Sequence, residues 1–547
     1  MTDTGSSRWH LPALIAVLLL TLGLSLISIH VPFARDQGVA ALVATAILRG
    51  GAPYRDVYHF NFPGIFFAYA LAMKLFQAKV EAVNLFDALY RLLTLAAIYG
   101  LTREAAGRRA AVWAGLCYGL FSTVLYNDYW DQAQKETFTV LPVVLAVWLV
   151  ARATQNATVV SRAPKDNLNR APKDNISVWQ LFVAGAFVAL ACYFKPTLGI
   201  MGLALAAEVA WPGERSRRGA VRGLILLLAG FVAGWIPLLA YLLGTHTLRE
   251  MVAGVFIYGR FYGGGAYTGL GDVLKLSLAR SAKWLLDWRA LIVLSAAAAI
   301  HGRRAHTPGL RLLLLWTLAA YLHVFLQMKF FSYHWVVLLG PLSVLAGMGV
   351  AAIFPERPRV SGPLLPVAAA LLLGALLIGS LYEPARRYQR EALYDLGLIQ
   401  AGDFYRPYGK WGEGDICIQA EQAAAQYLRW HTDPQDRVLV FGLEPAINFL
   451  AERRPPTRFA YDQPLTADPR GNAGFAAYQA GLRREFLGDL QAHPPVYVVV
   501  VEKDVTSVEP IESYQQMLAF TDFHDWLERN YFLETKIEHY FMYRRKP

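Results

Sequence analysis

Charged side chains beside long apolar runs are the first candidates for chemistry in this sequence. Asp36 comes just after the first apolar run, and Asp56 and His59 follow in a polar, aromatic segment of the same loop. A low dielectric raises the pKa of a carboxylate, which suits it to remove a proton from a hydroxyl, so Asp36 is the candidate general base. The alternative role for Asp36 is a helix N-cap before residues 37–48. Asp56 and His59 are candidates for contacts to an acceptor.

A later loop carries two more acids, Asp128 and Asp131. They are candidates for acceptor contacts or for a second acid near Asp36, and the alternative is a pair of ordinary solvated loop acids. The sequence has no HxH, HExxH or paired-cysteine spacing, and its three cysteines are far apart. The sequence therefore gives no firm indication of a cofactor, and a divalent metal ion remains an open alternative.

A third set of candidates is basic. Lys195 interrupts an apolar hairpin, and Lys329 and His334 flank a later turn. Arg260 lies in a glycine-rich run, which we predict to be a mobile loop. Each of these residues alone is more often an anchor to lipid headgroups. Together on one side of a membrane, they would suit an anionic leaving group such as a lipid phosphate.

The composition predicts the scaffold that must position these groups. The chain has 547 residues, of which 55% are apolar and only 17% are charged, whereas about a quarter of residues are charged in soluble proteins. Apolar runs recur at roughly the length that crosses about 30 Å of hydrocarbon. We predict a mainly α, polytopic transmembrane bundle of about 11 spans, at residues 11–30, 87–101, 110–125, 137–150, 178–211 (two spans), 223–243, 284–300, 310–327, 335–354 and 363–381.

The charge distribution predicts an orientation in the cell membrane. The net charge is +11, and the Arg and Lys residues gather in alternate short loops between apolar runs. Basic loops face the cytoplasm, which places the N-terminus inside and the candidate residues outside. Charge arranged in this way orients a membrane protein among lipids and gives no reason to expect a nucleic-acid partner.

The residues after the last apolar run predict a second domain. We expect a transmembrane domain over residues 1–381, with juxtamembrane helices in a first outer loop at 31–86, and an extracytoplasmic α/β domain over 382–547. Segments typical of strands alternate there with segments typical of helices. The strands are expected at 437–442, 458–461, 496–501 and 532–544, and the helices at 445–453, 472–491 and 513–530.

The order of the motifs resembles the GT-C superfamily of membrane glycosyltransferases, which includes protein O-mannosyltransferases and the aminoarabinose transferases of lipid A. The resemblance covers most of residues 1–381. It lies in residues 35–37, 48–56 and 61–64 and in three later motifs, Gln134-Lys-Glu136, Phe194-Lys195-Pro196 and Lys329-Phe-Phe-Ser-Tyr-His334.

This resemblance implies an inverting transfer of a sugar from a polyprenyl-phosphate donor to a lipid, glycan or protein acceptor. It implies Asp36 as the base, Lys195 as a contact to the donor phosphate, and Asp128 or Asp131 as the acid of the second loop. Many relatives have a second acid directly after the base, whereas this chain has Gln37. The alternatives are a transporter or flippase of lipid-linked glycans and a non-catalytic membrane scaffold subunit.

Overall fold

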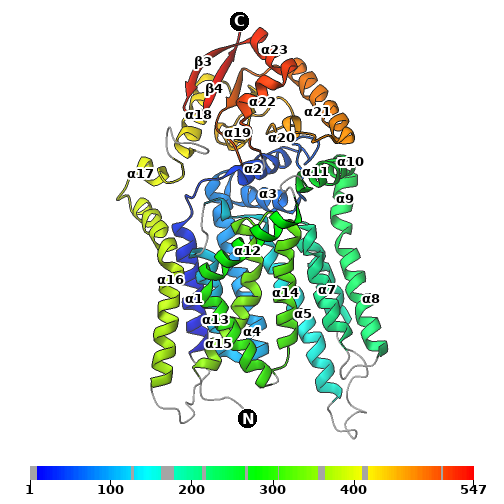
Figure 1. The fold of residues 1–547 in the computed structure, drawn as a ribbon, viewed down its shortest axis with the longest axis vertical. Coiled ribbons are helices and arrows are strands. Elements are labelled where there is room, and N and C mark those ends of the chain that lie inside the picture. The colour runs from blue at the N-terminus through cyan, green and yellow to red at the C-terminus, as the bar shows by residue number, and fades with distance from the viewer. Residues whose placement is uncertain are drawn as a thin grey trace. The chain divides into compact units, whose positions relative to one another are not determined.

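The computed structural model describes nine stretches of the chain, which form two compact units (Figure 1). The described residues are 9–124, 129–161, 178–211, 217–264, 269–305, 307–354, 364–409, 417–506 and 509–547. Unit 1 comprises residues 1–29, 84–240 and 269–389, and unit 2 comprises residues 30–83, 241–268 and 390–547. The predicted boundary near residue 381 stays a prediction, and unit 2 combines the first loop with the C-terminal segment.

Unit 1 is a bundle of apolar helices, and one continuous apolar core runs through it. Its helices are α1 (His10–Ile27), α4 (Val80–Val124), α5 (Lys135–Ser161), α6 (Val178–Cys192), α7 (Gly199–Ala210), α8 (Arg217–Gly234), α9 (Ile236–Gly244), α12 (Leu270–Asp287), α13 (Arg289–Arg304), α14 (Leu310–Gln327), α15 (Leu339–Ile353) and α16 (Leu364–Asp395). Among the described residues, three short 3₁₀ segments lie between them, η1 (Tyr129–Asp131), η3 (Pro196–Leu198) and η5 (Ser332–Leu338).

The bundle confirms the fold class, although not the number of spans. Within the described stretches, six helical segments are long and apolar enough to cross a membrane, or seven if α12 and α13, which meet at 86°, form one broken span. One segment, Val80–Thr123, has 44 residues and a kink at Gly107, where φ is 87°. At 1.5 Å per residue it is roughly twice as long as the hydrocarbon is thick, so it includes the run predicted at 87–101 and most of the run predicted at 110–125. Three shorter apolar helices, Trp179–Cys192, Pro196–Ala210 and Ala370–Tyr382, overlap the runs predicted at 178–211 and 363–381.

Unit 2 is built around a four-stranded sheet in the order β1-β2-β4-β3. The strand β1 (Val438–Phe441) pairs in parallel with β2 (Tyr497–Val501), and β2 pairs antiparallel with β4 (Tyr540–Arg545), which forms a hairpin with β3 (Tyr531–Ile537). Every residue of β1 and β2 is buried, which explains the continuous apolar sequence of these two strands.

Helices cover both faces of this sheet. The helices α18 (Ile418–His431) and α19 (Ala446–Ala451) pack on one face. On the other face lie α21 (Ala473–Ala492), α22 (Ser513–Ala519) and α23 (Thr521–Asn530). Short helices complete the unit, namely α10 (Leu248–Val252), the π-helix η4 (Ala253–Tyr258), α11 (Gly259–Gly264), α17 (Ala401–Tyr405) and α20 (Gln463–Thr466).

The first loop contributes α2 (Arg35–Leu48), α3 (Gly64–Phe76) and the start of α4 to unit 2. Residues 37–44 of α2 are all buried, and α2 packs against α19 of the C-terminal segment. The intervening loop is also fixed to that segment, because the Tyr58 N–H donates to the Arg458 carbonyl (2.8 Å) and Arg458 Nη1 donates to the Tyr54 carbonyl (2.9 Å).

Three local predictions are wrong. Residues 458–461 form no strand, because their backbone pairs with Tyr58 instead of a sheet neighbour. The helix predicted at 513–530 is two helices, α22 and α23, which meet at Phe520. The glycine-rich run is helical over its first part, α11, where Phe261 stacks on Phe475 with ring centroids 3.7 Å apart.

Candidate active site

Asp36 lies in the first turn of α2 and is exposed. The helix begins at Arg35, and Ala34 with its extended backbone is the N-cap. The predicted N-cap role of Asp36 is therefore wrong, because the helix starts before Asp36. A carboxylate in the first turn is still stabilised by the partial positive charge of the helix N-terminus. The preceding residue, Arg35, is largely buried and bonds to Glu444.

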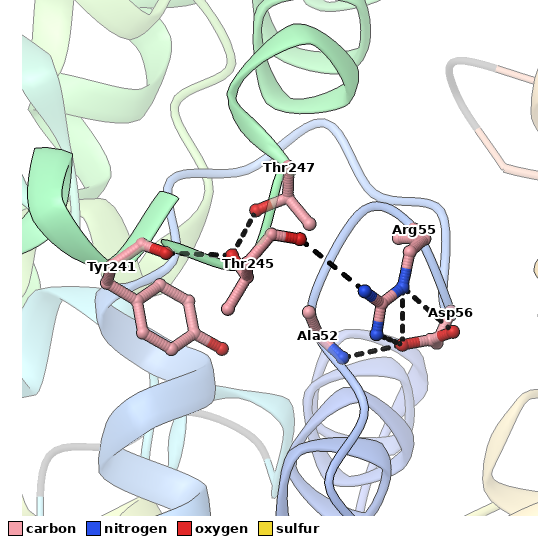
Figure 2. Close-up of polar contacts among 6 residues, drawn as sticks. All are labelled: Ala52, Arg55, Asp56, Tyr241, Thr245 and Thr247. Atoms are coloured by element: carbon pink, nitrogen blue, oxygen red, sulfur yellow. Dashed lines mark hydrogen bonds and ion pairs between the residues drawn. The ribbon is translucent and has the colours of Figure 1, made fainter. Parts of the chain in front are cut away.

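Asp56 closes the tight turn that follows α2 (Figure 2). Its Oδ2 accepts hydrogen bonds from the Ala52 N–H (2.6 Å) and from Arg55 Nη2 (2.8 Å), and Arg55 also reaches the Thr245 carbonyl. Burial alone would raise the pKa of Asp56, but the hydrogen bonds from Arg55 and Ala52 outweigh it and lower the pKa. These contacts tie the first loop to residues 241–247 and hold Asp56 ionised.

His59 is buried in an aromatic cluster with Phe66 and Tyr461, at ring-centroid distances of 5.1 and 5.9 Å. Its Nδ1 accepts hydrogen bonds from the Phe60 and Asn61 N–H groups, both at 2.9 Å. An accepting Nδ1 places the proton of the neutral ring on Nε2. His59 thus orders the backbone of the loop, and its contact with an acceptor stays a prediction.

The basic candidates divide between the two units. Arg260 is exposed on α11 of unit 2, whereas Lys195, Lys329 and His334 belong to unit 1. Lys195 comes between α6 and η3, where Pro196 ends the helical hydrogen bonding and leaves the Lys195 backbone extended. The hairpin break predicted at residues 194–196 is confirmed.

In unit 1, Lys195 and His334 meet around a buried acid. Lys195 Nζ lies 2.6 Å from Glu136 Oε1 and also hydrogen-bonds Gln327 Oε1. His334 Nε2 lies 3.8 Å from the same Glu136 oxygen. Glu136 is completely buried, so its charge depends on these cationic and polar neighbours. Gln327 Nε2 in turn lies 2.9 Å from His323 Nε2, which orders the amide.

Asp131 contacts the same polypeptide segment as His334. It is buried in η1 and accepts a hydrogen bond from the Ser332 hydroxyl. Lys329 lies three residues before Ser332 and is half-buried. Asp128, the other acid predicted for this loop, lies outside the described residues. The tertiary structure thus brings together Asp131 and the segment from Lys329 to His334.

Three residues of these clusters were given no more than a minor role by sequence reasoning. From the sequence, Glu136 is interpreted as an ordinary acid at a helix N-terminus, and Gln327 as the polar residue that ends an apolar run. Glu444 follows a strand and carries no motif. The uncharged residues that follow Glu136 are the only sign in the sequence that its side chain is buried. Its partner Lys195 is far away in the sequence, so their contact leaves no local pattern.

The sequence and the structure were compared with known proteins. Residues 61–162 match the family model of dolichyl-phosphate-mannose-protein mannosyltransferases. The fold is similar to that of ArnT from Cupriavidus metallidurans bound to undecaprenyl phosphate, with a TM-score of 0.58 and 14% identity over 98% of each chain. The archaeal oligosaccharyltransferase AglB from Archaeoglobus fulgidus, in complex with an inhibitory peptide and a dolichol-phosphate, has a TM-score of 0.50 and 13% identity over 100% of this chain and 75% of its own. A search of curated proteins found no match.

The chain has the GT-C fold. This confirms the predicted resemblance and fold class, and the apolar helices make the protein a multi-pass membrane protein. The part of the chain matched by the family model includes Asp131 and Glu136. The likeness to ArnT extends over 98% of this chain, so it includes the C-terminal α/β segment.

A metal ion would need several acids, histidines or cysteines close together. Among the residues placed by the structure, no three His, Cys, Asp or Glu side chains lie close enough together to hold a metal ion. Asp36 is followed by Gln37, whose side chain is buried. Within the described stretches, the acids therefore form no carboxylate-bound metal site.

Proposed function

We propose that this protein transfers a sugar from a polyprenyl-phosphate donor to a hydroxyl of an acceptor at the outer face of the cell membrane, with inversion at the anomeric carbon. The observation that carries the proposal is the Lys195–Glu136–His334 cluster on a GT-C fold. ArnT and AglB, the solved structures it resembles, were determined with undecaprenyl phosphate and dolichol-phosphate. The acceptor is a lipid, a glycan or a protein.

In the proposed reaction, Asp36 removes the proton of the acceptor hydroxyl as its oxygen attacks the anomeric carbon. The new glycosidic C–O bond forms while the bond from that carbon to the phosphate oxygen breaks. The proton ends on Asp36, and the electron pair leaves with the polyprenyl phosphate. General-base catalysis of this kind contributes about 10²- to 10⁴-fold in rate.

Lys195 is proposed to stabilise the phosphate charge that develops at the leaving group. An ammonium whose position is fixed before the reaction needs little reorganisation when that charge appears. Glu136 and Gln327 fix the Lys195 ammonium, and His334 borders the same carboxylate. Lys329 and Arg260 are proposed as additional cations for the phosphate, and Asp131 as the acid that contacts the acceptor.

The test is a transfer assay with purified protein and a polyprenyl-phosphate sugar. Asp36→Asn is expected to lower kcat by at least 100-fold with unchanged thermal stability. Asp403→Asn is the matched control, because Asp403 is also an exposed acid in the first turn of a helix in unit 2. Wild-type turnover in Asp36→Asn would remove Asp36 as the base, and no transfer by the wild type from any polyprenyl-phosphate sugar would contradict the proposed function.

A further inference from the structure

Within unit 2, the residue before Asp36 is held by an acid from the C-terminal segment. Arg35 Nε and Nη2 donate to Glu444 Oε1 at 3.2 and 3.0 Å. The Arg35 side chain is 18% exposed and that of Glu444 is 3% exposed. The two residues are 409 positions apart in the sequence. A charge-assisted pair that is this deeply buried keeps one geometry better than a surface ion pair does.

The helix bearing Asp36 lies unusually close to the element that follows Glu444. A Cβ atom at Gly38 of α2 would come within 2.8 Å of both the Cβ and the backbone nitrogen of Ala446, at the start of α19. Phe33, which precedes α2, packs on Phe449 of α19 with ring centroids 5.7 Å apart. The contact between α2 and α19 is therefore tight on both sides of the Arg35–Glu444 pair.

Arg35 is also surrounded by other acids of unit 2. Burial first, and then the charge of Glu444, raise the pKa of Glu421, while Arg35 opposes that rise. Burial also raises the pKa of Asp462 and of Glu509, and Arg35 opposes both of these rises. Moving the guanidinium out of this environment would leave buried acids without the positive charge of Arg35, so the position of Arg35 is strongly determined.

We propose that Glu444 is a positioning residue for the general base, acting on Asp36 through Arg35. The proposal rests on the proposed function, in which Asp36 is the base. Consecutive residues of an α-helix are separated by a 1.5 Å rise and about 100° of rotation, so fixing the direction of Arg35 fixes that of Asp36. The C-terminal segment would thus set the orientation of a carboxylate in the first loop. A displacement of about 1 Å at a reacting group can lower a rate by about 100-fold.

The test compares Glu444→Gln with Glu452→Gln in the full-length protein. Glu452 directly follows α19, and its pair with Arg429 is exposed, so it is the matched control. Glu444→Gln is expected to lower kcat about tenfold with unchanged KM for the donor, to alter the pH dependence of kcat, and to speed amide hydrogen exchange in residues 33–40. Glu444→Asp, which keeps the carboxylate, should restore part of kcat, and Glu452→Gln should behave as wild type.

Arg35→Lys provides a second variant in case Glu444→Gln does not fold. It keeps the positive charge among the acids but loses the planar fork of the guanidinium, and it should give the same faster exchange and lower kcat. Wild-type kcat and wild-type exchange in residues 33–40 in the folded variants would overturn the proposal. Exchange does not depend on turnover, so an inactive wild type or a fully active Asp36→Asn would contradict the proposed function without altering this readout.

Discussion

Lys195 Nζ lies 2.6 Å from Glu136 Oε1, and the Glu136 side chain is completely buried. This pair joins the break between α6 and η3 to the first turn of α5. The carboxylate is compensated by an ammonium that also hydrogen-bonds Gln327. Lys195 therefore has a structural role in unit 1 beside its proposed role at the donor phosphate, and the two roles can be separated by mutation.

Lys195→Met should destabilise the protein strongly, because it leaves Glu136 buried without its cation. Breaking a buried pair by removing one partner costs about 3 to 5 kcal/mol. The double variant Lys195→Met/Glu136→Gln should recover most of the thermal stability and should still lack transfer activity. Stability is measured by thermal unfolding in detergent. Activity in the stable double variant would show that Lys195 has no role at the phosphate.

Gly38→Val should separate α2 from α19. Its side chain would meet the backbone of Ala446 at less than 3.0 Å from the Cβ alone, and overpacking of this kind costs about 1 to 3 kcal/mol. We expect a lower melting temperature and faster amide exchange in α2. Gly481→Ala is the control, because nothing lies within 4 Å of a Cβ at that helical glycine. An unchanged melting temperature in Gly38→Val would mean that the contact between α2 and α19 is looser than described.

Unit 2 should lose stability as the pH rises from about 4 to about 9. Burial, followed by the charge of Asp504, raises the pKa of Asp462 to about 7, and burial, followed by the charge of Asp462, raises that of Glu509 to about 9. A carboxyl group whose pKa is raised in the folded state binds its proton more tightly there, so its stabilising effect is lost as the pH rises through the folded value. Each unit of pKa difference corresponds to about 1.4 kcal/mol.

Asp462→Asn should remove much of this pH dependence, because the variant has no carboxyl group to ionise at position 462 and Glu509 loses a negative neighbour. The measurement is amide exchange of β2 and α20 between pH 5 and pH 9, corrected for the intrinsic rate. Asp468→Asn is the control, because Asp468 is an exposed acid whose Oδ1 accepts a hydrogen bond from the Arg470 N–H in a turn. Equal pH dependence in the wild type and Asp462→Asn would contradict the prediction.

Asp56→Asn should weaken the turn between α2 and the aromatic segment only slightly. The variant loses the charge that pairs with Arg55, and exposed ion pairs are worth about 0 to 1 kcal/mol. Because the pKa of Asp56 is lowered in the folded state, its contribution is present at neutral pH and is lost as the pH falls through that lowered value. Limited proteolysis of residues 49–57 at pH 7 and pH 4 measures the effect, and a large loss of stability at pH 7 would contradict it.

The sequence predicts the fold class well because hydrocarbon imposes a local requirement on composition. A helix must be apolar over the thickness of the membrane, so each run is visible in the chain itself. Counting spans is harder, because the kink at Gly107 and the bend between α12 and α13 depend on packing. The strands β1 and β2 were also predictable, because residues 438–441 and 497–501 are short, continuous apolar runs.

The sequence alone determined a membrane helical bundle of the GT-C type, an α/β C-terminal segment, and a short set of charged residues, Asp36, Asp131, Lys195 and His334 among them. Only the tertiary structure decided the partners of these residues, namely Glu136 for Lys195, Ser332 for Asp131 and Glu444 for the neighbour of Asp36. The physical reason is the distance along the sequence over which each interaction acts. Helix periodicity and hydrophobic runs act over a few residues, whereas the ion pair between Arg35 and Glu444 joins positions 409 residues apart and leaves no pattern in either segment.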